Sequence, residues 1–89
     1  MPTWRSPLDV AAFVYVLLSV RKPPRTYVGW TLDLERRVAQ HNQGSGARTT
    51  RGGTWILVYA ERYRTRNAAM RREVFLKRDR EFRKLLRQR

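Results

Sequence analysis

Apolar residues gather in three short runs that are rich in β-branched and aromatic side chains. The runs cover residues 13–18, 26–30 and 55–59, and turn-forming residues separate them. Such runs predict buried β-strands. A short segment containing Pro23 and Pro24 joins the first two runs, which predicts that they pair as a hairpin.

The segment after the second run has helical spacing instead. Thr31 is the expected N-cap of this helix, because acidic residues follow in the first turn and Leu34, Val38 and His41 recur at helical intervals. The helix is expected to end in a polar, glycine-rich loop over residues 42–53.

Two further helices are predicted after the third strand. Thr65 is the expected N-cap of the first, which covers about residues 67–77, and a break near Asp79 precedes a last helix. The order β-β-α-β-α-α predicts an α+β fold, a small antiparallel sheet flanked by helices. We expect an N-terminal leader over residues 1–12 and one domain over residues 13–89.

The chain is strongly basic, with 20 Lys and Arg against 7 Asp and Glu among 89 residues, a net charge of +13. A charge of this size points to a polyanionic partner, most simply nucleic acid. Arg48 and Arg51 in the glycine-rich loop could cradle phosphate, or the loop could simply be flexible. The arginine-rich stretch 62–89, with Arg72 and Lys77, is a second candidate, the alternative being a solvated basic face.

Several kinds of site are excluded by composition. The chain has no Cys and a single His, His41, which rules out zinc fingers, disulfide frameworks and multi-histidine metal sites. The longest apolar run, residues 10–18, is far shorter than the ~20 residues that span a bilayer. A cytoplasmic location and no membrane partner are therefore expected. In so short a chain the core should need the apolar residues of the last helices, namely Phe75, Leu76, Phe82, Leu85 and Leu86.

Three ionisable residues lie on or beside apolar helix faces and need an explanation. At about 100° per residue, Arg37 and His41 lie one turn apart beside the apolar stripe, while Arg36 points away. Each could be a core-covering side chain or part of an anion site. Glu73 lies on an inward face of the next helix. It either pairs with Lys77 or an arginine, or it is the ligand of a single Mg²⁺.

Tyr15 and Tyr27 lie in the first two strands, where a tyrosine usually packs in the core with its hydroxyl on a partner. Gly29 follows within the second strand, and a glycine there often marks a close backbone approach.

Together these positions resemble the GIY-YIG nuclease superfamily, and Phe13 stands where the first signature usually has glycine. The resemblance is greatest to small single-domain bacterial members, which are similar to the nuclease subunit of the eukaryotic branched-DNA resolving complex. The segments that carry the resemblance are residues 13–15, 27–29, 33–42, 46–52 and 69–73, followed by Lys77.

The resemblance implies a three-stranded antiparallel sheet and metal-dependent hydrolysis of a DNA phosphodiester. Glu73 would be the ligand of Mg²⁺ or Mn²⁺, and Arg37 would stabilise charge on the scissile phosphate. Tyr15 and Tyr27 would place or deprotonate the attacking water, and His41 occupies a position where relatives carry His or Tyr. Whether Tyr15 or His41 takes the proton stays open.

The expected partner is DNA, structured or single-stranded, and self-association or a protein partner could supply targeting. Two other functions stay open at this point. The first is a catalytically weak or silent nucleic-acid-binding module of the same fold. The second is a basic RNA- or ribosome-associated protein.

Overall fold

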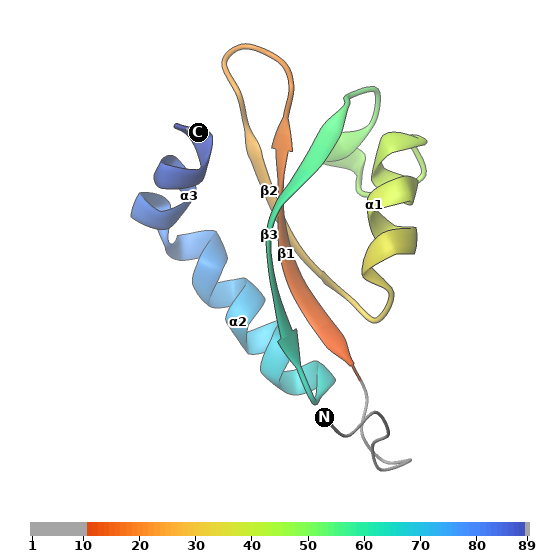
Figure 1. Ribbon diagram of the computed structural model, residues 1–89, viewed down its shortest axis with the longest axis vertical. Coiled ribbons are helices and arrows are strands. Elements are labelled where there is room, and N and C mark those ends of the chain that lie inside the picture. Colours follow the sequence, from red (N-terminus) through yellow and green to blue (C-terminus); the bar gives the residue numbers. More distant parts are fainter. Residues whose placement is uncertain (1–10, 89) are drawn as a thin grey trace, which may run out of the picture.

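The central element is β1 (Ala12–Ser19), which pairs antiparallel with β2 (Thr26–Thr31) and with β3 (Trp55–Tyr63), giving the strand order β2-β1-β3. The computed structural model describes residues 11–88. The other elements are α1 (Leu34–Asn42), the short 3₁₀ helix η1 (Arg48–Thr50), α2 (Arg66–Arg78) and α3 (Arg80–Arg87) (Figure 1). The predicted α+β fold and element order are confirmed. The expected leader lies outside the described residues, except for its last two, and Ala12 already belongs to β1.

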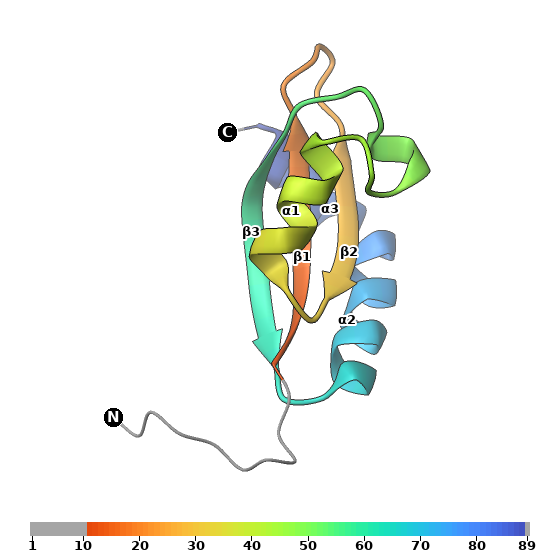
Figure 2. The same ribbon diagram turned by 90° about the vertical axis from the view of Figure 1, so that its right-hand side faces the viewer.

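Helices cover both faces of the sheet, with α1 on one side and α2 and α3 on the other (Figure 2). Because successive side chains of a strand point to opposite faces, Val14 and Val16 of β1 join the core beneath α2. Tyr15 and Leu17 face α1 and pack with Trp55. A central strand covered on both faces explains why its sequence reads as a continuous apolar run.

The start of α1 differs from the prediction. Asp33, not Thr31, is the N-cap, and its side chain accepts a hydrogen bond from the Arg36 backbone N–H at 3.1 Å. Thr31 instead accepts from the Asp33 backbone N–H at 3.1 Å, so it stabilises the turn before the helix. The expected cap at Thr65 and the break at Asp79 are confirmed.

The apolar residues of the last helices divide into two groups. Leu76 is buried, and Phe82 and Leu86 pack partly buried against the same core, as predicted. Phe75 and Leu85 are 56% and 65% exposed, so their assignment to the core was wrong. A single helix face meets the sheet, and Phe75 lies outside it, with the Arg72 guanidinium 5.0 Å from its ring centroid. No helix within residues 11–88 is long and apolar enough to cross a membrane.

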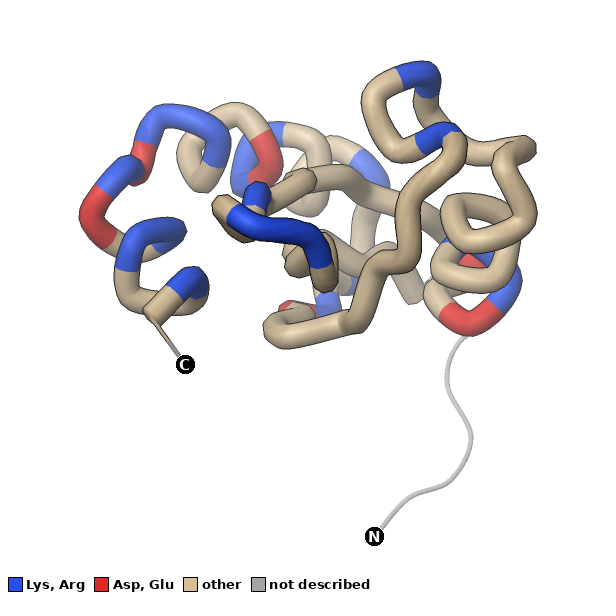
Figure 3. Tube along the Cα trace, turned by 90° about the horizontal axis from the view of Figure 1, so that it is seen from above, with Lys and Arg blue, Asp and Glu red and all other residues tan. Residues whose placement is uncertain are grey.

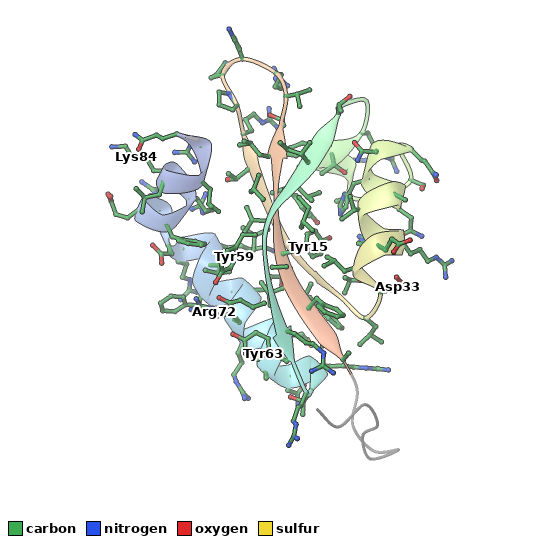
Figure 4. All side chains as sticks on the ribbon, in the orientation of Figure 1. Tyr15, Asp33, Tyr59, Tyr63, Arg72 and Lys84 are labelled. Atoms are coloured by element: carbon green, nitrogen blue, oxygen red, sulfur yellow. The ribbon has the colours of Figure 1, made fainter. Side chains whose placement is uncertain are left out.

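A polar cluster fastens α2 to β3 on this side of the sheet (Figure 4). Tyr59, Glu61 and Tyr63 alternate along one face of β3, and both tyrosine hydroxyls donate to the Glu61 carboxylate. Arg72 of α2 donates to the same carboxylate through Nε at 2.8 Å and Nη2 at 3.0 Å. The guanidinium, through these hydrogen bonds, lowers the pKa of Glu61 to about 2. Arg72 immediately precedes Glu73, so this cluster also fixes the helix that carries Glu73.

Candidate active site

Three rings from three elements meet on the α1 side of the sheet. Tyr15 of β1 and Tyr27 of β2 have ring centroids 6.3 Å apart, and the His41 ring of α1 lies 5.8 Å from Tyr15 and 4.8 Å from Tyr27. Trp55 at the start of β3 closes the group, with its ring edge-on to Tyr27 at 6.4 Å. The fold thus brings together three of the residues that the sequence singles out.

A directed chain of hydrogen bonds passes through His41. Its Nε2 lies 2.8 Å from the Tyr15 hydroxyl, and its Nδ1 lies 2.7 Å from Thr50 Oγ1. Thr50 donates its only hydroxyl proton to the Ala47 carbonyl at 2.8 Å, so its oxygen must accept from His41 Nδ1–H. Nε2 then carries the lone pair of a neutral imidazole, and Tyr15 donates to it.

Burial sets the protonation of this pair. Tyr15 is 1% exposed and His41 is fully buried. Burial raises the pKa of Tyr15 to about 12, although the Arg37 guanidinium acts in the opposite direction. Burial, followed by the positive charge of Arg37, lowers the pKa of His41, so the imidazole is neutral at pH 7. Forming a free Tyr15 phenolate at pH 7 would cost about 7 kcal/mol. The neutral imidazole of His41, in contrast, can accept a proton at this pH.

Two glycines make room for these side chains. Gly29 is the register partner of Tyr15, and a Cβ on it would lie 2.5 Å from the Tyr15 hydroxyl and 3.1 Å from the Tyr27 ring. A Cβ on Gly46 would lie 2.5 Å from His41 Nδ1. The predicted close approach at Gly29 is confirmed, and side-chain packing rather than a turn is its cause.

Arg37 lies at the open edge of the sheet, where β2 has no further strand. The guanidinium is half-buried and donates to Gln40 Oε1 at 3.2 Å, while Arg36 is exposed, as the helical spacing predicts. A hollow of about 450 Å³ lies beside Arg37, between α1 and the β2 residues Trp30 and Thr31. Within residues 11–88 no carboxylate lies within ion-pair distance of Arg37, so its charge is available to an anion.

Glu73 lies on α2, and its negative charge acts on Tyr15, whose pKa it helps to raise. Its side chain is 18% exposed, and its Oε2 lies 3.5 Å from Lys77 Nζ. The part of the chain that the structure describes holds no group of three or more metal-ligating side chains. One carboxylate still fits Mg²⁺, because this ion keeps several waters and takes its other ligands from substrate phosphates.

The four residues predicted to bind nucleic acid are divided between two places. Arg48 and Arg51 are exposed at η1, beside the turn in which Thr50 holds His41. Arg72 is engaged by Glu61 and Lys77 by Glu73, so both sit in ion pairs. Their part in nucleic-acid binding stays a prediction.

Sequence reasoning missed Thr50, which holds His41 in place. A threonine in a polar, glycine-rich loop carries no signal of its own, and only the fold brings it to the imidazole. Phe13, the departure in the first signature, lies two positions before Tyr15 on the same face of β1. It lines a separate hollow of about 630 Å³ with Leu34 and Val38 of α1 and Leu57 of β3.

A hydrogen bond joins Tyr15 to His41, and the charges of Arg37 and Glu73 both act on Tyr15. The family model of the GIY-YIG catalytic domain matches residues 11–85. The chain belongs to the GIY-YIG family.

Its similar relatives are UPF0213 proteins of archaea and bacteria, a wider range than the bacterial members expected from the sequence. One from Natronomonas pharaonis is 47% identical over 62 residues, which cover 68% of this chain and 71% of the relative. One from Clostridium perfringens is 42% identical over 66 residues, which cover 73% of this chain and 69% of the relative. One from Streptococcus pneumoniae is 39% identical over 72 residues, which cover 80% of this chain and 71% of the relative. No solved structure matches the chain.

Proposed function

We propose that this protein is a metal-dependent DNA endonuclease, with branched and single-stranded DNA as the substrates to test first. The observation that carries the proposal is the directed chain from Tyr15 through His41 to Thr50, with Arg37 beside it. Membership of the GIY-YIG family supports phosphodiester hydrolysis as the chemistry. The net charge of +13 suits a polyanionic substrate.

The chain suggests a path for the proton of the attacking water. Both nitrogens of His41 are engaged, Nε2 by the Tyr15 hydroxyl, so the proposed route of a proton from water to the imidazole passes through Tyr15. In the proposed step the Tyr15 oxygen takes a proton from water while its own proton passes to His41 Nε2. No free phenolate forms, which avoids the cost that its high pKa would impose.

The hydroxide formed in this step attacks the phosphorus, and the bond from phosphorus to the 3′ oxygen breaks. Solvent protonates the leaving oxygen, so the products are a 3′-hydroxyl and a 5′-phosphate. His41 then returns its extra proton through Tyr15. Thr50 acts as a positioning residue, because it holds the imidazole in the tautomer that accepts from Tyr15.

Arg37 and Glu73 supply the charge that a phosphodiester requires. The Arg37 guanidinium is placed to donate to the phosphate oxygens, which gain negative charge in the transition state. Glu73 would hold Mg²⁺ or Mn²⁺, and Lys77 would have to leave it. When bound there, the ion polarises the phosphate oxygens.

The test is cleavage of end-labelled single-stranded, duplex, flap and four-way-junction DNA with Mg²⁺ or with EDTA. We expect metal-dependent nicking that Glu73→Gln abolishes and that Tyr15→Phe lowers by about 10²-fold or more. Glu81→Gln is the matched control, because Glu81 is an exposed glutamate on the neighbouring helix α3. Full activity in Glu73→Gln would refute the proposed role of Glu73.

The ion pair between Glu73 and Lys77 favours a second candidate, a nucleic-acid-binding module of the same fold with little catalysis. Such a module would bind DNA in a salt-dependent manner, without any effect of EDTA, and would give no product at high protein excess. Strong preference for RNA over branched DNA in competition would instead indicate an RNA-associated protein.

A further inference from the structure

Three arginines from two distant segments line one hollow at the end of the sheet. The hollow, about 330 Å³, lies between the β1–β2 turn and the loop that leads from η1 into β3. Arg21 and Arg25 line it from the turn, and Arg51, Gly52, Gly53 and Trp55 line it from the loop. Figure 3 shows basic residues on both segments and no acidic residue on either.

The charges of these arginines are not neutralised within the described chain. All three are exposed, and no carboxylate among residues 11–88 lies within ion-pair distance of them. Like charges that converge on one hollow repel one another unless an anion lies between them. Guanidinium groups bind phosphate oxygens through paired hydrogen bonds, so phosphate is the anion that the site suits.

Backbone hydrogen bonds fix the two walls relative to each other. Val20 N–H of the turn donates to the Thr54 carbonyl at 3.1 Å, which joins the turn to the loop. Within the turn, Ser19 N–H donates to the Arg25 carbonyl at 2.9 Å and Arg25 N–H donates to Ser19 Oγ at 2.8 Å. The arginines therefore project from a defined scaffold.

Trp55 connects this hollow to the candidate active site. Its ring lines the hollow and also meets Tyr27 edge-on, and its Nε1–H donates to the Thr50 carbonyl at 3.0 Å. Thr50 in turn holds His41. The hollow therefore adjoins the candidate active site through Trp55, which packs with Tyr15 and Tyr27.

We propose that this hollow is a second phosphate subsite. It binds a phosphate of the DNA strand, and this phosphate is not the scissile one. The proposal rests on the nuclease function proposed above and adds where the strand is held. The subsite contributes affinity and register, while Tyr15, His41, Arg37 and Glu73 remain the groups for the chemistry.

The test compares two triple variants with equal charge change. Arg21→Gln, Arg25→Gln and Arg51→Gln remove the subsite. Arg62→Gln, Arg64→Gln and Arg66→Gln are the control, because these exposed arginines lie at the opposite end of the sheet, where β3 ends. Binding to fluorescent duplex and flap DNA is measured in EDTA over a series of salt concentrations, and thermal melting verifies that both variants fold.

We expect the subsite variant to bind roughly tenfold more weakly and to reduce the slope of log K against log salt by about 1 to 2. The control variant should show a clearly smaller loss of affinity and a clearly smaller change in the salt slope. Equal losses in the two variants would overturn the proposal, because the hollow would then contribute no more than exposed arginines of the basic stretch 62–89. If the subsite variant does not fold, the single variants Arg21→Gln and Arg25→Gln carry the same comparison against Arg62→Gln and Arg64→Gln.

Cleavage separates this proposal from the nuclease proposal. With Mg²⁺, we expect the loss of kcat/KM in the subsite variant to arise in KM rather than in kcat. Selective loss of binding in a protein that never cleaves would support the subsite and refute the nuclease. Cleavage by the wild type with equal binding losses in both triple variants would support the nuclease and refute the subsite.

Discussion

Replacing Glu61 with Gln should destabilise the fold to an extent that depends on pH. The Glu61 side chain is 19% exposed and accepts from the hydroxyls of Tyr59 and Tyr63 and from the Arg72 guanidinium. Glutamine keeps the shape of the side chain but not its charge. The variant leaves Arg72 without its counter-charge and weakens the contact between β3 and α2.

The pKa of Glu61 gives the size of the effect. Arg72, more than any other group, lowers this pKa from the usual 4.5 to about 2. At ~1.4 kcal/mol per pKa unit, the difference corresponds to roughly 3–4 kcal/mol, and solvent at the exposed part of the side chain reduces it to about 2–3 kcal/mol. Because the folded pKa is the lower one, this stabilisation is complete well above pH 4.5 and is lost as the pH falls toward 2.

Urea unfolding of the wild type and of Glu61→Gln at pH 7 and pH 3 measures the effect. We expect the difference in free energy of unfolding at pH 3 to be less than half of that at pH 7. Glu81→Gln, on an exposed part of α3, should change stability by less than about 0.5 kcal/mol at either pH. A Glu61→Gln difference that is the same at both pH values would refute the reasoning.

Three further predictions concern the candidate active site. Burial and the charge of Arg37 hold the pKa of His41 below 6.5. The value of kcat/KM should therefore fall as the pH is lowered, with a midpoint below pH 6.5. A midpoint above pH 6.5 would contradict the assignment of His41 as a neutral proton acceptor. Thr50→Val leaves His41 Nδ1–H without its acceptor. The variant should lose about 1–3 kcal/mol of stability, and its cleavage rate should fall at least tenfold. Unchanged cleavage would exclude a positioning role for Thr50. Gly29→Ala places a Cβ 2.5 Å from the Tyr15 hydroxyl. The variant should lose about 1–3 kcal/mol of unfolding free energy, measured by heat or urea, and should also lose cleavage activity. A fully active variant would show that Tyr15 can move freely.

Local patterns in the sequence determined the elements. The apolar runs predicted all three strands. A strand covered on both faces, as β1 is, is apolar along its length, and a strand covered on one face is apolar at alternate positions. Helical spacing also separated half-buried Arg37 from exposed Arg36, since neighbours on a helix lie about 100° apart. Where two capping residues stood close together, at Thr31 and Asp33, the sequence could not distinguish them. The choice depends on where the chain leaves β2.

Tertiary structure alone decided the contacts between distant residues. Tyr15 and His41 are 26 positions apart, and the register of β1 and the packing of α1 bring them together. Other contacts likewise join separate elements: Thr50 accepts from His41, Arg72 donates to Glu61, and Arg51 lines one hollow with Arg21 and Arg25. Local propensity is a property of neighbours along the chain, whereas these contacts arise from layers packing over one sheet. The sequence by itself therefore determined the kind of domain and its candidate residues, and only the packed fold decided which of them share protons and charge.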